Sequence, residues 1–150
     1  MRRFVLALLL AATQASASHY VSLKSGKVYL REGPTYKHRV LFVYQRKGYP
    51  FEVLTAYDSW RRVRDSDGAI GWISQTMLSD LRSVLVLGKA RADIRIRLDP
   101  TSPVVAKADP GVVARLKACK PRFCQIVAGG VTGWIERDRI WGVDPGEIIN

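Results

Sequence analysis

The chain contains few of the residues that most catalytic and metal centres require. Its 150 residues include two Cys and two His, and these are scattered along the sequence as His19, His38, Cys119 and Cys124. A zinc site built from four such ligands would need all of them, so the sequence argues against a metal centre. The G-x-x-x-x-G-K and G-x-G-x-x-G motifs are also absent from the sequence, and we expect no cofactor.

Acidic residues are scarce as well. Only 13 Asp and Glu oppose 24 Lys and Arg, which gives a formal net charge of +11. This excess predicts an anionic partner or a basic surface. The positive charge is spread over both halves of the chain and does not form a basic arm, so we expect no specific nucleic-acid partner.

Long apolar runs are missing except at the N-terminus. Arg2 and Arg3 precede nine apolar residues, Phe4 to Ala12, and Ala15-Ser16-Ala17 follows. This pattern predicts a signal peptide over residues 1–17 and a periplasmic or secreted protein. A retained membrane anchor is the alternative, but nine residues rising about 1.5 Å each cross only about half of a bilayer core. After cleavage we expect no stable membrane insertion.

Helical periodicity is scarce in the remaining chain, which alternates short apolar runs with turn residues. The runs typical of strands are Val28 to Leu30, Val40 to Tyr44, Phe51 to Ala56, Arg61 to Val63 and Ala69 to Ile73. Asp67-Gly68, between two of them, is typical of a hairpin turn. Many short strands with frequent turns predict an all-β fold, as a small barrel or sandwich.

Four short matches, kept in order, indicate an internal duplication. Arg31 to Thr35 resembles Arg97 to Thr101 at an offset of 66 residues, and Gly71-Trp72-Ile73 matches Gly133-Trp134-Ile135 at an offset of 62. The other matches lie between these two, at an offset of 63: Gly48 with Gly111, and Trp60 with Phe123.

The duplication predicts two modules, residues 19–80 and 82–143, followed by a C-terminal tail over residues 144–150. The junction has no Pro and no Gly/Ser run, unlike a flexible linker. A barrel of about 60 residues is near the lower size limit for independent folding, so we expect the two modules to pack against each other. The sequence defines no oligomeric state.

Two stretches resemble bacterial SH3-like (SH3b) domains. Val21 to Pro34 resembles their opening, and Trp60 to Ile73 contains a W-x-x-V pattern followed by G-x-x-G-W. The ending, Gly133-Trp134-Ile135 followed by Ile140 to Val143, resembles one exported subfamily of tandem bacterial SH3 proteins. The resemblance implies two tandem SH3-like barrels, each of five to six strands, with a binding role. Tyr29 departs from the family, which usually has Asn there.

Cys119 and Cys124 flank Lys-Pro-Arg-Phe at a predicted turn between two strands. Cross-strand neighbours have Cα atoms about 4.5–5.5 Å apart, which is within disulfide range. A redox motif would need C-x-x-C at a helix start, and a catalytic thiol would need a nearby His. We therefore predict a structural disulfide.

The candidate ligand-binding residues are aromatic and basic. SH3 barrels bind extended chains in aromatic-lined grooves beside the first long loop, which makes Tyr36, Trp60 and Trp72 candidates. On a strand, Trp60, Arg62 and Arg64 share one face, so a ring beside two guanidinium groups could bind an anionic sugar polymer or peptide carboxylates. The alternatives are aromatic packing and a solvated strand face. His38 is either a pH-sensitive ligand contact or a solvated loop residue.

The sequence therefore predicts a non-catalytic exported binding module that recognises peptidoglycan or another cell-envelope component. The alternative is a protein–protein interaction or scaffold module in the periplasm. A cell-wall hydrolase comes third, because a glycosidase needs two carboxylates, and Glu32, Glu52 and Asp58 are present.

Overall fold

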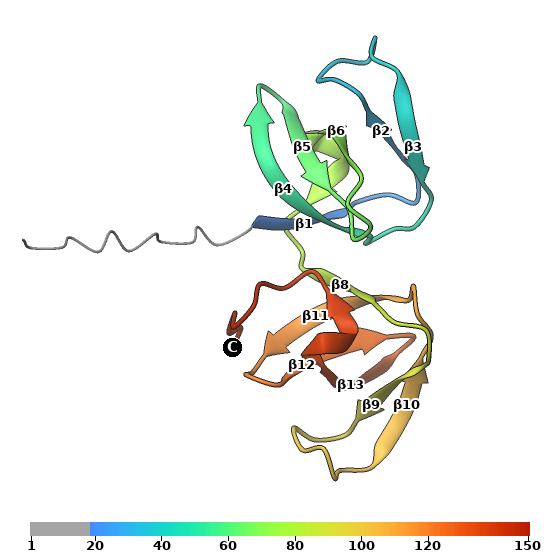
Figure 1. Ribbon diagram of the computed structural model, residues 1–150, viewed down its shortest axis with the longest axis vertical. Coiled ribbons are helices and arrows are strands. Elements are labelled where there is room, and N and C mark those ends of the chain that lie inside the picture. Colours follow the sequence, from blue (N-terminus) through green and yellow to red (C-terminus); the bar gives the residue numbers. More distant parts are fainter. Residues whose placement is uncertain (1–18) are drawn as a thin grey trace, which may run out of the picture.

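The computed structural model describes residues 19–150, which form two β-lobes stacked along the long axis of the molecule (Figure 1). The predicted signal peptide lies outside these residues. Within residues 19–150, no helix is long and apolar enough to span a bilayer. The all-β expectation is confirmed, since the two short 3₁₀ turns are the helical elements of this part of the chain.

The first module is one antiparallel sheet of seven strands, in the order β3-β2-β6-β5-β4-β1-β7. Its elements are β1 (His19–Leu23), β2 (Val28–Arg31), β3 (Val40–Tyr44), β4 (Pro50–Tyr57), β5 (Trp60–Arg64), β6 (Ile70–Ser74), η1 (Gln75–Met77) and β7 (Leu78–Ser79). The five runs expected from the sequence thus correspond to β2 through β6. The strand β1 was not among them.

The second module repeats this topology strand for strand, in the order β10-β9-β13-β12-β11-β8-β14. Its elements are β8 (Ser83–Val86), β9 (Ala92–Arg95), β10 (Val104–Ala108), β11 (Val113–Cys119), β12 (Phe123–Ala128), β13 (Val131–Glu136), η2 (Arg137–Arg139) and β14 (Ile140–Trp141). Each element of the first module has its counterpart seven strands later, so the structure agrees with a duplication.

Hydrogen bonds fix which residues correspond in the two copies. Gly48 donates to Leu23 O and Gly111 donates to Val86 O, in agreement with the offset of 63. The offset of 66 at the first loop is wrong. Arg31 pairs with Trp72, whereas Arg95 pairs with Trp134, so the true offset there is 64. The similar residues of the two loops occupy different positions in the same turn.

The Gly-Trp motif has a steric cause in both modules. A Cβ atom on Gly71 would lie 2.6 Å from the Leu30 side chain and 2.8 Å from the Arg31 carbonyl oxygen. A Cβ on Gly133 would meet Ile94 and Arg95 at 2.5 and 2.8 Å. Only glycine therefore lets β6 approach β2, and β13 approach β9, so closely.

Each module has its own apolar core. The first contains Val21, Leu23, Val28, Leu30, Phe51, Val63, Ile73 and Leu78. The second is built from Val84, Val86, Ala92, Ile94, Ala108, Ala114, Leu116, Ile126, Ile135 and Ile140, together with both cysteines. These cores hold the outer sheet faces, where a ligand could bind, in fixed positions.

The two cysteines form a disulfide, as expected, with their Cα atoms 4.1 Å apart across β11 and β12. The tail after the second module is bound to the same hairpin. Cys119 and Ile149 exchange two backbone hydrogen bonds of 2.8 and 3.0 Å, and Glu147 forms an ion pair with Arg82 at 2.8 Å. The tail therefore packs on the second module as an additional strand-like segment.

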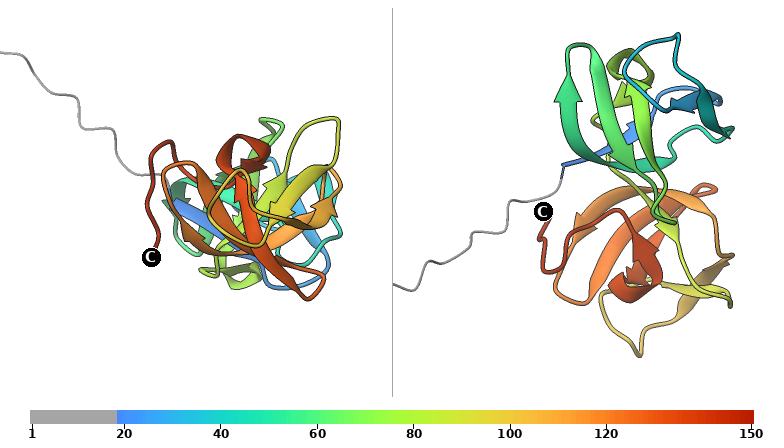
Figure 2. Two further views of the ribbon diagram at one scale, coloured as in Figure 1. Left: turned by 90° about the horizontal axis from the view of Figure 1, so that it is seen from below. Right: turned by 45° about the horizontal axis from the view of Figure 1, so that its top comes forward.

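The two modules also contact each other, as expected for small barrels (Figure 2). The Ser22 hydroxyl donates to Leu81 O of the connecting segment at 2.7 Å, and the Ser83 hydroxyl of the second module donates to Gly48 O of the first. Arg46, in the same turn as Gly48, donates to Gly111 O. Polar contacts thus link the turn before β4 to the second module and the turn before β11 to the first module.

Candidate ligand-binding groove

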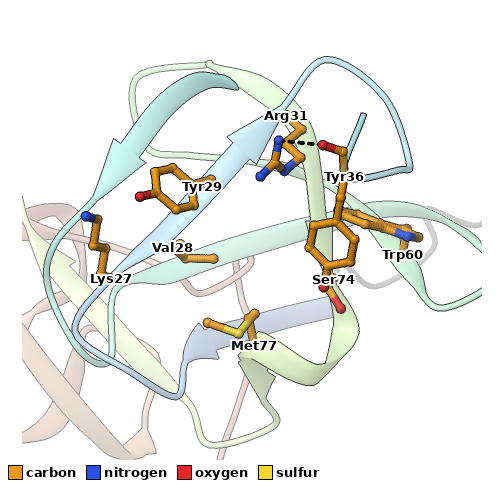
Figure 3. Close-up of a pocket in the computed structure, with 8 residues that line it drawn as sticks. All are labelled: Lys27, Val28, Tyr29, Arg31, Tyr36, Trp60, Ser74 and Met77. Atoms are coloured by element: carbon orange, nitrogen blue, oxygen red, sulfur yellow. Dashed lines mark hydrogen bonds between the residues drawn. The ribbon is translucent and has the colours of Figure 1, made fainter. Parts of the chain in front are cut away.

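A groove of about 190 Å³ lies on the outer face of the first module (Figure 3). We call it the aromatic groove. Its lining comes from β2, the loop after β2, β5, β6 and η1, and consists of Lys27, Val28, Tyr29, Arg31, Tyr36, Trp60, Ser74 and Met77. Figure 3 shows Tyr29 and Tyr36 on opposite sides, with Val28 and Met77 between them. Its surface is therefore mostly aromatic and aliphatic.

Tyr36 and Trp60 form one wall of this groove. Their ring centroids are 4.9 Å apart with an angle of 67° between the ring planes, an edge-to-face arrangement. Trp60 is 7% exposed and Tyr36 is 70% exposed. Trp60 is thus fixed by packing, whereas Tyr36 presents a ring face to solvent beside it.

Arg31 holds the loop that carries Tyr36. Its Nη1 donates to the carbonyl oxygens of Tyr36 and His38 at 3.1 and 3.0 Å. The same guanidinium lies 5.5 Å from the Tyr36 ring centroid and 5.7 Å from that of Tyr29, within cation–π range of both. Arg31 therefore shapes the groove and places a positive charge between its two tyrosines.

The groove has a positive charge that its own lining does not neutralise. Lys27 lies 5.3 Å from the Tyr29 ring centroid. Within residues 19–150, neither Lys27 nor Arg31 forms an ion pair, and the lining contains no Asp or Glu. Two cations beside aromatic rings can bind a ligand that combines an apolar or sugar face with a negative group.

The residues expected to bind a ligand fall into three groups. Tyr36 and Trp60 line the groove together. Arg62 and Trp72 lie outside the lining. Trp72 pairs with Arg31 on one neighbouring strand and with Arg62 on the other, so both residues lie on the sheet face that carries Arg31. Arg64 is neutralised by Glu52, whose Oε2 lies 2.6 Å from its Nη2.

His38 packs within the loop and does not line the groove. A Cβ on Gly33 would come within 2.6 Å of three His38 ring atoms, so the imidazole covers this glycine. Six groove residues were missed by the sequence-based expectation: Lys27, Val28, Tyr29, Arg31, Ser74 and Met77. The alternation of Lys27, just before β2, with Tyr29 and Arg31 on β2 is the pattern that could have indicated three of them.

The second module has a different pocket at the equivalent place. This charged pocket has a volume of about 120 Å³ and is lined by Arg91, Asp93, Arg95, Glu136 and Arg139. By strand position these correspond to Lys27, Tyr29, Arg31, Ser74 and Met77 of the aromatic groove. The aromatic, hydroxyl and thioether groups have thus been replaced by charged ones.

The charges of this pocket are largely satisfied within the protein. Asp93 accepts a hydrogen bond from Lys107 at 2.7 Å and contacts Arg95 at 3.5 Å, and the Lys107 bond lowers the pKa of Asp93. Arg139 donates to the Leu87 and Ala90 carbonyl oxygens. A ligand would have to compete with these bonds, so the first module offers the better binding surface.

A comparison with protein families agrees with this tandem architecture. A family model described as a bacterial SH3 domain matches the chain twice, over residues 24–80 and 88–142. Among solved structures, NlpC2 from Trichomonas vaginalis is similar with a TM-score of 0.38 and 15% identity, covering 89% of this chain and 52% of that one. NlpC1 from the same organism gives 0.37 and 17%, covering 91% and 50%. The chain spans about half the length of these two proteins. No curated protein matches.

Proposed function

Because this chain belongs to the bacterial SH3 domain family, we propose that it is a non-catalytic binding protein of the cell envelope and that the aromatic groove holds its ligand. The observation that supports this most directly is the pair of unneutralised cations, Lys27 and Arg31, beside Tyr29 and Tyr36. Peptidoglycan combines sugar rings with peptide stems that carry carboxylates, and it therefore offers both kinds of group that the groove can bind.

The groove size limits what it can hold. Sites for drug-sized ligands have volumes of about 300–1,000 Å³. At about 190 Å³, the groove accommodates one sugar ring or a short peptide stem, and the rest of a polymer would extend over the outer face. Trp72 and Arg62 lie on that face, in the next row of paired residues, and we propose them as outer contacts.

An envelope location is supported by two independent features. The pattern of residues 1–17 is typical of a signal peptide. Cys119 and Cys124 form a disulfide, a bond that persists in oxidising compartments such as the periplasm or the cell exterior.

The non-catalytic assignment is supported by how the candidate catalytic groups are used. The disulfide leaves neither cysteine as a thiolate for a Cys–His hydrolase. None of the three carboxylates considered for a glycosidase, Glu32, Glu52 and Asp58, lines the groove. Glu52 binds Arg64, and Glu32 lies 3.6 Å from Arg39. A groove without a nucleophile–base pair is better suited to binding than to hydrolysis.

Co-sedimentation of residues 18–150 with purified peptidoglycan, at low and high salt, tests this function. We expect binding that weakens as salt rises, because charge–charge attraction is screened. Tyr36→Ala should weaken it about fivefold, since an aromatic contact contributes about 1 kcal/mol. Phe42→Ala is the matched control, because Phe42 is 54% exposed and lies outside the groove. Absence of binding at low salt would refute the proposal.

A protein partner is the second candidate, and one observation favours it. The strand β3 is an edge of its sheet, and it exposes Phe42 and Val43 by 54% and 44%. An unpaired, apolar edge can accept a strand from another protein. Binding to an envelope protein that resists salt and depends on Phe42, but not on Tyr36, would favour this alternative.

A further inference from the structure

A second, larger cleft lies where the two modules meet. Its volume is about 460 Å³, and residues from both modules line it. The first module contributes Lys24 and Lys47, the second contributes Arg115, and the connecting segment contributes Arg82. None of these residues lines the aromatic groove, so this inter-module cleft is a separate site.

All charged residues that line the cleft are cationic. Lys24, Lys47 and Arg115 are exposed and form no ion pair within residues 19–150, whereas Arg82 is neutralised by Glu147. Three positive groups from three separate segments thus face one hollow without a counter-charge. Their mutual repulsion costs free energy, and a bound anion would remove that cost.

Several cations of the second module, by contrast, pair with carboxylates. On the second module, Arg91 pairs with Asp109 at 2.8 Å and Arg122 pairs with Glu136 at 3.4 Å. Lys107 pairs with Asp93 at 2.7 Å. The cleft combines several cations with no acidic lining residue, as the aromatic groove does, and it draws them from both modules.

The walls of the cleft are held in position by the contacts between the modules. The Ser83 hydroxyl donates to Gly48 O, next to Lys47. The Ser22 hydroxyl donates to Leu81 O at 2.7 Å, next to Arg82. Because both bonds lie in the lining itself, the main chain beside Lys47 and Arg82 needs little reorganisation to receive a ligand.

We infer that the inter-module cleft binds a multivalent anion, that is, a ligand carrying at least two phosphate or carboxylate groups. Charge-assisted contacts from Lys47 in one module and Arg115 in the other would recognise such a ligand. A ligand bound by both modules also links them, so it stabilises their relative arrangement.

Calorimetric titration of residues 18–150 with inorganic tripolyphosphate and, separately, with citrate tests this inference. Binding of either probe supports it, and the stronger probe identifies phosphate or carboxylate as the preferred group. The double variant Lys47→Gln/Arg115→Gln should weaken binding at least tenfold. The control Lys89→Gln/Arg97→Gln removes the same charge from exposed positions outside the cleft and should change binding less than twofold.

Three results would overturn the inference. The first is no binding of either probe at millimolar concentration, and the second is an equal loss of binding in the two double variants. The third is that changes in NMR amide chemical shifts on adding the probe are confined to the aromatic groove and absent at Gly48 and Ser83. Thermal unfolding checks that each variant is folded. Tyr36→Ala should leave tripolyphosphate binding unchanged. Failure of the cleft is therefore distinguishable from failure of the proposed peptidoglycan site.

Discussion

Replacing Tyr29 by Asp should transfer the chemistry of the charged pocket into the aromatic groove. Asp93 holds the equivalent place in the second module, where it binds Lys107 and Arg95. Tyr29 is 41% exposed, so the fold should accept the change. The new carboxylate would face Lys27 and Arg31, which lie 5.3 and 5.7 Å from the ring centroid that it replaces.

The expected loss of binding free energy has two parts, the repulsion between the new carboxylate and an anionic ligand and the loss of the aromatic contact. Two like charges about 5.5 Å apart repel by about 0.8 kcal/mol in water and by about 3 kcal/mol at the effective dielectric near a protein surface. Loss of the aromatic face adds about 1 kcal/mol. Together these terms weaken the binding of an anionic ligand by about 20-fold or more.

The assay is the co-sedimentation titration with peptidoglycan at low salt, with circular dichroism as the check on folding. Ile96→Asp is the control, because it adds the same charge at a position of the second module that is 51% exposed. The control should bind within twofold of the parent. Unchanged affinity of a folded Tyr29→Asp protein would refute the assignment of the groove.

Three further predictions concern stability. Gly133→Ala should destabilise the protein by about 1–3 kcal/mol in urea unfolding, because its Cβ would clash with β9, whereas Gly26→Ala, with nothing within 4 Å, should not. The hydrogen bond from Arg82 lowers the pKa of Glu147, so the stability it contributes is lost as pH falls below about 4.5; Glu147→Gln should flatten this acid limb. Burial, with the Asp144 carboxylate next in effect, raises the pKa of Tyr20 to about 12, so stability should fall as pH rises from 10 to 12. Tyr20→Phe should reduce this fall in thermal unfolding and leave the part due to Tyr44 and Tyr49, whose pKa values burial also raises.

The fold could be predicted because its determinants are local. Alternation and turn residues placed β2 through β6 within one or two residues, and Gly71 and Gly133 marked equivalent close contacts in the two copies. The cross-strand disulfide also followed from local spacing. The strand β1 was missed because its run, His19–Leu23, lies next to the predicted cleavage site and has no turn signal before it.

The candidate site was predicted only in part, because a groove depends on register. Trp60 and Tyr36 were identified by residue type, but the neutralisation of Arg64 depends on its pairing with Glu52, 12 residues away. That register includes an irregularity between Val53 and Thr55, which no local pattern indicates. Met77 enters the groove from a 3₁₀ turn that the sequence did not predict.

The contact between the modules has a consequence for each module in isolation. The turn at Gly48 receives a hydrogen bond from the second module, and the equivalent turn at Gly111 receives one from Arg46 of the first. The donors are not equivalent residues, but each half covers a carbonyl oxygen of the other half. A single module produced alone would expose the surface that the other half covers. Such a fragment should be less stable than the same module in the tandem chain, which satisfies these carbonyl oxygens within one molecule.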